Sequence, residues 1–344
     1  MSVNAWKTLS EIVGFVLAFV LGVSAADPAA TRTQTVDLKA GWNAVFLEVE
    51  PANPEPAAVF AGTPVDMAAS FFARAGSAQY ITDPAANLYK RAGWGVWYAP
   101  ERPDAFLSTL HAVHGQRGYL VHALADLVWP VQGQVVRLPY RWEPNAFNLT
   151  GFPVARQGAP TFAQYFQGSK AHRHNRIYRL EGGSWRRVLD PSAEAMRSGE
   201  AFWIFCDGAS TYQGPLRVQT PIERALFLGR AVGDVVLRNE STHPLTPTME
   251  HVAAEGDPVP LSIVLQGVRG GGALRSELAA PKPAGAWVQT LPPIEAGEGI
   301  RVPLEARREA LTGAHQVSLL KISTDLGTEE WVPVISGRED LEEQ

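Results

Sequence analysis

The sequence predicts a mainly β protein in which two duplicated β-rich modules, each with one short helix, precede a C-terminal antiparallel β-sandwich. Three observations predict this class. Short apolar runs alternate with turns that draw on 31 glycines and 26 prolines among 344 residues. A set of aromatic and glycine positions occurs twice in the same order. The last third of the chain has several short strand-like segments and almost no helical periodicity.

The composition limits how large a hydrophobic core the chain can bury and which classes of partner it can bind. Hydrophobic residues make up 46% of the chain and charged residues 19%. A chain of this length can bury cores for about two or three domains. The formal net charge is −5. A mildly acidic protein is a poor match for nucleic acid or an anionic membrane surface, so we expect neither as a partner.

Residues 1–25 predict a signal peptide. Lys7 precedes an apolar run over 12–23, and the Val-Ser-Ala of 23–25 has the small-x-small form of a cleavage site. Cleavage at Ala26 and an uncleaved anchor are the alternatives. No cysteine lies directly after the apolar run, at the place where a bacterial lipoprotein is cleaved and lipidated, which excludes a bacterial lipoprotein. We therefore expect a secreted protein, in the periplasm, at the cell surface or outside the cell, with no membrane span after cleavage.

The first predicted module covers 36–138. Its opening strand has apolar side chains at every second position over 45–49, which is typical of a half-buried strand. A short helix is predicted over 57–61, between prolines and Gly62. An apolar strand at 119–121 leads to the closing hairpin of the module.

The second predicted module covers 141–218. Thr161 can cap a helix whose aromatic side chains repeat at i, i+3 and i+4, and Gly168 ends that helix. A glycine pair at 182–183 predicts a hairpin turn. The apolar strand 202–206 then leads through a polar turn into another strand.

Six landmarks of the first module recur in the second. The numbering offset between paired landmarks declines nearly steadily along the chain, as a duplication with loop deletions in the second copy would produce. Chance similarity would scatter these offsets. The pairs are Trp42-Asn43 with Phe147-Asn148, Phe60-Ala61-Gly62 with Phe166-Gln167-Gly168, Leu88-Tyr89-Lys90 with Ile177-Tyr178-Arg179, Trp97 with Trp185, Tyr119-Leu120-Val121 with Phe202-Trp203-Ile204, and Gln132-Gly133 with Gln213-Gly214.

Residues 219–224 predict a linker to a third domain over 225–337. Short strands separated by glycine, proline and asparagine turns favour an antiparallel sandwich there. The better-defined strands are predicted at 260–265, 287–291, 300–304, 317–322 and 331–335.

The opening Lys39-Ala40-Gly41-Trp42-Asn43 resembles the Gly-Trp-Asn strand starts of repeat modules in secreted bacterial surface proteins. The 225–337 region is similar in strand spacing to the Ig-like sandwich modules appended to such proteins, so the third domain is expected to be Ig-like. The second copy departs from the opening motif, because it has Ala146-Phe147-Asn148. The resemblance implies a surface or assembly role and carries over no functional residue.

Three carboxylates are candidate catalytic acids. Glu48 and Glu50 project from one strand face, and two residues along a strand span about 6.6–6.8 Å, near the carboxyl separations of glycosidases. Asp190 is the third candidate. One strand edge does not place carboxylates on both sides of a sugar. The solvated face of a half-buried strand is therefore the favoured interpretation of Glu48 and Glu50.

The histidines and the single cysteine predict no metal or cofactor. His111 and His114 lack the intervening acid and the spacing of a zincin motif. His172 and His174 lie among lysine and arginine residues, which favours a solvated basic loop over a metal site. Cys206 is the only cysteine, so no intrachain disulfide forms, and its apolar strand favours a buried small hydrophobe over a reactive thiol.

The aromatic side chains are the strongest candidates for ligand binding. Trp94, Tyr98, Trp129 and Trp142 do not recur clearly between the copies. Exposed together, they would stack on sugar rings or contact a partner protein. Additional core packing against the neighbouring domain is the favoured interpretation of these four side chains.

Three functions remain open at this point. The favoured hypothesis is a secreted, non-enzymatic structural or interaction protein, because no set of residues converges on a catalytic mechanism. The second is a carbohydrate-binding protein, and the weakest is a glycan-active hydrolase. The expected partner is a protein or a cell-surface glycan.

Overall fold

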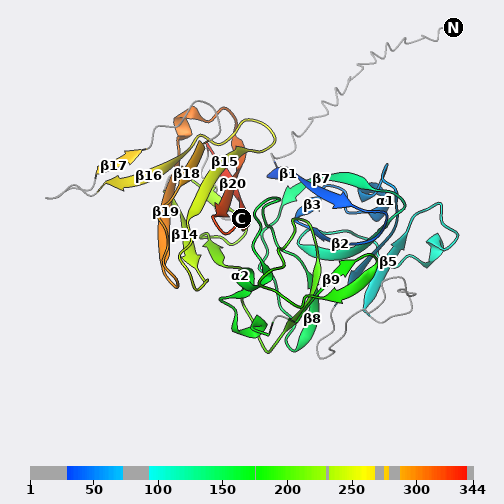
Figure 1. Ribbon diagram of the computed structural model, residues 1–344. Coiled ribbons are helices and arrows are strands. Elements are labelled where there is room, and N and C mark those ends of the chain that lie inside the picture. The colour runs from blue at the N-terminus through cyan, green and yellow to red at the C-terminus, as the bar shows by residue number, and fades with distance from the viewer. Residues whose placement is uncertain are drawn as a thin grey trace, which may run out of the picture.

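The computed structural model describes residues 29–72, 93–174, 176–229, 232–267, 275–278 and 287–338. Strands dominate these residues, and helices are confined to short segments. The predicted mainly β class is therefore confirmed. The predicted signal peptide and the landmark at 88–90 lie outside the described residues. Figure 1 shows the modules in blue to green beside the sandwich in yellow to red.

Within the described residues, the first module forms a three-stranded and a four-stranded antiparallel sheet. Its elements are β1 (Thr31–Leu38), β2 (Gly41–Leu47), β3 (Val49–Pro51), α1 (Pro56–Val59), β4 (Val65–Phe71), β5 (Trp94–Tyr98), η2 (Ala105–Leu107), β6 (Arg117–Ala123) and β7 (Leu127–Val135). The strand orders are β1-β7-β3 and β2-β6-β4-β5. Their facing side chains and α1 enclose a core that includes Phe60, Trp97 and Trp129.

The second module forms a four-stranded antiparallel sheet with the order β8-β11-β9-β10. Its elements are β8 (Ala146–Thr150), α2 (Phe162–Phe166), η3 (Lys170–His172), β9 (Ile177–Glu181), β10 (Ser184–Arg187) and β11 (Phe202–Cys206). Thr161 caps α2 as predicted, because its side chain and that of Gln164 exchange hydrogen bonds with each other's backbone. The aromatic face of α2 is buried under the sheet.

The two four-stranded sheets share their strand order and their register. Asn43 of β2 lies opposite Val121 of β6, and Asn148 of β8 lies opposite Ile204 of β11. These positions belong to landmark pairs found in the sequence. A one-residue slip would turn every side chain of a strand to the other face. The preserved register therefore identifies the modules as two copies of one unit.

The repeated asparagine has the same structural role in both copies. Asn43 Oδ1 accepts a hydrogen bond from the Lys39 N–H at 2.8 Å, and Asn43 Nδ2 donates to the Lys39 carbonyl oxygen. Asn148 forms the same two bonds with Glu143, at 2.9 Å and 3.2 Å. In each copy Nδ2 also donates to the carbonyl oxygen two residues earlier. The side chain thus closes the turn that begins the first strand of the sheet.

The sheet register changes two landmark pairs. Strand β9 has the place in the second sheet that β4 has in the first, so Ile177-Tyr178-Arg179 corresponds to residues 68–70 and not to 88–90. Strand β5 has the place in the first sheet that β10 has in the second. Along the shared register, Trp185 corresponds to Trp94 and not, as the sequence suggested, to Trp97. Trp94 and Trp185 both pack edge-on against Trp203, each with ring centroids 6.2 Å apart. The connection before β5 is much longer than the β9–β10 hairpin, and this obscured the match.

The two four-stranded sheets pack face to face around a shared core. Its buried members are Ala44, Phe46, Ala69, Trp94, Val96, Tyr98, Leu120, Phe147, Leu149, Leu180, Ala201 and Trp203. Trp203 of β11 enters this core, whereas Phe202 and Ile204 enter the second module's own core. Both faces of β11 are therefore buried, which explains its fully apolar sequence. A Cβ at Gly151 would lie 2.4 Å from the Glu200 carbonyl oxygen, so glycine permits this close approach.

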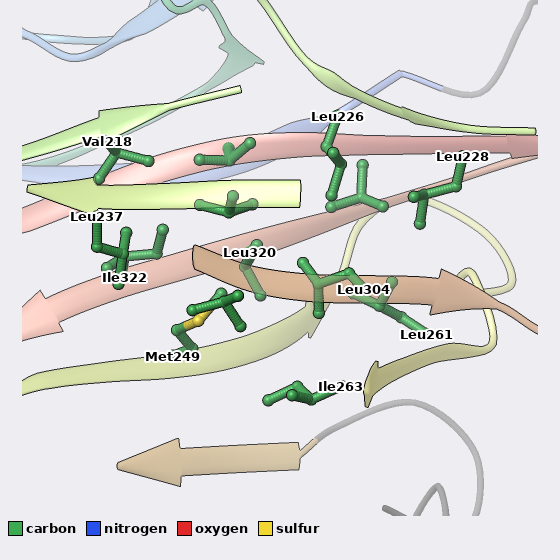
Figure 2. Close-up of a cluster of buried hydrophobic side chains, with 14 of the residues drawn as sticks. Val218, Leu226, Leu228, Leu237, Met249, Leu261, Ile263, Leu304, Leu320 and Ile322 are labelled. Atoms are coloured by element: carbon green, nitrogen blue, oxygen red, sulfur yellow. The ribbon is translucent and has the colours of Figure 1, made fainter. Parts of the chain in front are cut away.

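The C-terminal sandwich consists of two five-stranded sheets among the residues that the structure describes. One sheet has, in order, β12 (Leu216–Gln219), β14 (Gly233–Asn239), β19 (Gly299–Ala306), β16 (Leu261–Gly267) and β17 (Arg275–Leu278). The other has β13 (Leu226–Leu228), β21 (Glu329–Gly337), β20 (His315–Thr324), β15 (Pro247–Ala253) and β18 (Trp287–Thr290). The strands are antiparallel except for the β13–β21 pair. Aliphatic side chains from both sheets interdigitate in the core (Figure 2).

The structure places the start of the sandwich earlier than the sequence suggested. Residues 216–218 were expected in the second module, ahead of a linker at 219–224. Instead β12 pairs with β14, and Val218 lies in the sandwich core (Figure 2). A short apolar strand shows that one face is buried, but its own pattern does not identify the sheet it joins.

Candidate functional site at the module–sandwich junction

The sandwich contacts the first module through a small apolar cluster. Ala30 and Val135 lie at one end of the β1–β7 pair, and Val317 and Leu319 lie on β20. None of these four side chains is more than 6% exposed. Burial of this apolar surface favours one fixed orientation of the sandwich on the first module.

Glu48 belongs to an ion network at this interface. Its carboxylate accepts a hydrogen bond from the Arg32 guanidinium, and both side chains are largely buried. The Arg32 guanidinium lies 4.6 Å from the centroid of the Trp331 ring, and Lys321 Nζ lies 5.5 Å from the same ring. Burial raises the pKa of Glu48, and the charge of Arg32 opposes that shift. The Arg32–Glu48 ion pair of the first module therefore contacts the sandwich through the Trp331 ring.

The three candidate acids do not form a catalytic pair. Glu48 was expected on a solvated face, but it is 5% exposed because it pairs with Arg32 under the sandwich. Glu50 Oε1 lies 2.8 Å from His114 Nδ1, and Glu50 Oε2 accepts a hydrogen bond from a backbone N–H. Asp190 accepts backbone hydrogen bonds within its own exposed turn. Each acid has a separate local partner.

Arg137 connects three segments of the junction. Its guanidinium donates hydrogen bonds to the carbonyl oxygens of Val218 and Glu223, both at 2.8 Å. It also donates to the Thr220 hydroxyl and to the Glu330 carboxylate, both at 3.1 Å. The connection after β7 is thereby fixed to β12, to the segment after β12 and to β21.

A cavity of about 550 Å³ lies beside Arg137. Residues 135–142, which lead from the first module into the second, form one wall, and β12 with the following Thr220 forms another. Phe46, Phe152 and Trp331 add aromatic surface. The volume is within the range of ligand pockets, which occur preferentially at domain interfaces.

The four predicted ligand-binding aromatics are buried. Their exposed fractions are 9% for Trp94, 4% for Tyr98, 4% for Trp129 and 7% for Trp142. The first two lie in the shared core, Trp129 in the core of the first module and Trp142 in that of the second. Of the four, Trp142 also lines the junction cavity. The predicted exposed platform is therefore corrected to core packing, which uses the ring faces that a sugar would need.

His172 is also placed differently from the expectation of a solvated loop. It is 2% exposed, and its ring lies 4.1 Å from that of Trp142. His172 Nδ1 lies 2.6 Å from Ser169 Oγ, whereas Nε2 has no hydrogen-bond partner. Burial lowers the pKa of His172 to about 4. The neighbouring His174 is exposed, 3.9 Å from Asp207, so the two histidines do not share a site.

Cys206 is buried, as the sequence predicted. Burial raises the pKa of its thiol to about 11, which keeps it protonated and unreactive at neutral pH. Within the described ranges, no group of three or more histidine, cysteine, aspartate or glutamate side chains is placed to hold a metal ion.

Sequence reasoning missed an ionic cluster around His122. A bulge in β4, where the register shifts between Val65 and Met67, directs Asp66 toward β6. Asp66 Oδ1 lies 2.5 Å from His122 Nδ1, and Arg102 donates to Asp66 Oδ2 at 2.6 Å. No sequence signal marks a bulge of this kind.

Comparisons with known proteins assign no family. No protein-family model matches the chain, and no curated protein matches it. The collagen-binding domain of the Erysipelothrix rhusiopathiae surface protein RspB is 11% identical, with 91% of this chain and 93% of that chain covered and a TM-score of 0.17. The full-length major pilin SpaD of Corynebacterium diphtheriae is 8% identical, with 87% and 66% covered and a TM-score of 0.20.

A third solved structure, the ASH/PapD-like domain 7 of human CEP192, is 9% identical. It covers 37% of this chain and 87% of its own, with a TM-score of 0.20. Likenesses at these scores do not bear on function. In the part of the chain that the structure describes, no helix has the length and apolar character to cross a bilayer.

Proposed function

We propose that this chain is a secreted, non-enzymatic structural or interaction protein of the cell envelope or extracellular space. One observation carries the proposal: the sandwich is held on the modules by buried contacts that leave a lined cavity at the junction. Charged side chains at the cavity, Arg32 with Glu48 and Arg137 with Glu330, are paired with each other. Such pairing favours a rigid binding surface over acid–base chemistry.

The N-terminal segment and the opening motif support the proposed location. The apolar run before residue 26 has the features of a secretion signal. The Gly41-Trp42-Asn43 opening resembles strand starts of bacterial surface proteins. A bacterial surface protein with an Ig-like sandwich would bind another protein or a cell-surface glycan, and burial of the four candidate aromatics favours the protein.

The test is affinity capture with the chain from Ala26 onward as bait, from the envelope and culture fluid of the native host. We expect one protein partner, recovered in near-equal amount and again after reversing the bait and prey. Incubation of the same protein with panels of glycans and peptides is the second measurement. Catalytic turnover of any member would overturn the proposal, and recovery of polysaccharide without protein would replace it with carbohydrate binding.

A further inference from the structure

We propose that the junction cavity is a docking groove for an extended acidic segment of a partner polypeptide, which lies along β12. The inference rests on the proposed function, because it names the site at which an interaction protein of this shape holds its partner. Backbone groups on two walls of the cavity carry the argument, and the charges of the lining refine it.

The first wall is an edge strand. β12 pairs with β14 on one side and is the terminal strand of its sheet among the described residues. The Val218 carbonyl oxygen accepts a hydrogen bond from Arg137, so it points away from β14. Because backbone groups alternate in direction along an antiparallel strand, those of Leu216 point the same way. Leu216 therefore presents an N–H and a C=O toward the cavity side.

The second wall is an extended connection. Residues 135–142 line the cavity without interruption, and β7 ends at Val135. Tyr140 exchanges two backbone hydrogen bonds with the Gln213 side chain. The backbone groups of Val136, Leu138 and Arg141 have no hydrogen-bond partner in the described part of the chain. Unpaired backbone groups on two walls suit an extended peptide, since strand addition satisfies them.

The lining also has the side chains of a peptide site. Phe46, Phe152 and Trp142 supply apolar surface for alternate side chains of an extended segment. Of the four guanidiniums that line the cavity, Arg32 pairs with Glu48, Arg137 with Glu330 and Arg217 with Glu240. Arg141 is exposed and has no ion-pair partner among the described residues. An acidic side chain on the docked segment would pair with it.

Another edge strand shows the opposite design. β10 is the terminal strand of the second module's sheet, and its outer residues Arg186 and Arg187 are exposed and charged. Arg186 is held by Glu181 and Glu194 in ion pairs. Charged side chains on an edge discourage pairing with another strand. On β12 the Val218 carbonyl oxygen is already bound by Arg137, whereas the outward backbone groups of Leu216 have no comparable protection.

The test uses the full chain and a synthetic probe. The probe is a pool of fluorescein-labelled heptapeptides with glutamate fixed at the centre and random flanking residues, followed by fluorescence anisotropy. Two control pools have lysine at the centre or N-methyl groups at alternate positions, which remove backbone donors. We expect the glutamate pool to bind, the lysine pool to bind at least about tenfold more weakly and the N-methylated pool to lose binding.

Two protein variants localise the binding. Arg141→Glu reverses a charge on the cavity wall, and we expect it to weaken binding of the glutamate pool by about tenfold or more. Arg187→Glu reverses an exposed arginine on β10, away from the cavity, and should leave binding unchanged. Both side chains are exposed, and an unchanged melting temperature confirms that each variant folds. Absence of binding by the glutamate pool, equal loss in both variants or full binding of the N-methylated pool would overturn the groove.

The same variants separate this inference from the proposed function. Capture of the native partner is repeated with Arg141→Glu as bait. Loss of the partner supports the groove. If Arg141→Glu captures the partner as well as the unmodified chain does, the protein is still an interaction protein, but its partner does not bind in the groove. If the unmodified chain captures no partner and turns over a substrate, both the proposed non-enzymatic function and the proposed docking groove are wrong.

Discussion

The two modules share one sheet and cover it in different ways. In both, one face of the four-stranded sheet packs against the sister sheet. The first module covers its other face with the three-stranded sheet and α1. The second covers it with aromatic side chains of α2, Trp142 and His172. The register and the turn asparagine are thus common to both copies, whereas the layers that cover the two sheets differ.

The largest expected effect tests the shared core at one register position. Trp203 in the second module corresponds to Leu120 in the first, and neither is exposed. We expect Trp203→Ala to lower the free energy of unfolding by about 4–5 kcal/mol and Leu120→Ala by about 3 kcal/mol, because the larger side chain leaves the larger cavity. Urea unfolding monitored by circular dichroism measures both. A smaller loss for Trp203→Ala than for Leu120→Ala would contradict the central place of Trp203.

The next effect is a pH dependence that belongs to the second module. Burial holds the folded-state pKa of His172 at about 4, below its ordinary value of 6.5. The unfolded chain therefore takes up a proton first as the pH falls, and its uptake favours unfolding. Between pH 6.5 and pH 4 the free energy of unfolding should fall by about 2–3 kcal/mol from this group.

His172→Phe isolates that contribution. Phenylalanine keeps the ring contacts with Trp142 and Phe166 and removes the titrating group. Unfolding free energies measured at a series of pH values should fall less steeply in the variant than in the unmodified chain. Parallel pH curves for the two proteins would show that His172 is not buried in its neutral form.

The turn asparagines give a smaller effect that compares the copies directly. Asn43→Ala and Asn148→Ala each remove the hydrogen bonds that close the first turn. We expect losses of about 1–2 kcal/mol, with the larger loss at Asn148 because it is 3% exposed and leaves buried backbone groups unpaired. Thermal unfolding of both variants measures the difference. If neither substitution lowers the thermal stability, closing this turn is not the reason that the asparagine occurs in both copies.

Much of the fold could be predicted from the sequence for identifiable reasons. The capped helix after Thr161 and the repeated asparagine are local signals, and each matches the structure. The half-buried strand predicted over 45–49 is instead divided between β2 and β3, which lie in different sheets, and both of its faces are buried. The pairing of β12 with β14 is a long-range choice that no local pattern encodes. The same applies to the equivalence of Trp94 with Trp185, which depends on the register and not on sequence order.

The candidate site was less predictable than the fold. Trp94 and Trp142 showed no clear counterpart in the sequence of the other copy, which made them candidates for an exposed platform. Trp94 nevertheless corresponds to Trp185, and the side chains of Trp94 and Trp142 are both buried. Glu48 looked like an outward-facing residue of a half-buried strand, but the sandwich covers that face. The cavity is formed by segments of all three parts, so its lining has no signature in any one segment.

The smallest expected effect concerns a position where the copies differ in chemistry. His122 lies beside Trp42 with ring centroids 5.2 Å apart, and the corresponding Phe205 lies 5.1 Å from Phe147. The second copy thus shows that the scaffold accepts an aromatic pair here. We expect His122→Phe to change the free energy of unfolding by about 1 kcal/mol or less, because Asp66 keeps its ion pair with Arg102.

Thermal unfolding of His122→Phe and of a matched Asp66→Asn variant measures this difference. Asp66→Asn weakens the bonds to both partners, so it should destabilise the chain more than His122→Phe does. If His122→Phe is the more damaging change, the histidine holds the β4 bulge in place and the first copy depends on it. If the order is as expected, the sheet does not require the histidine, and the Asp66–His122 pair is a divergence that the shared unit tolerates.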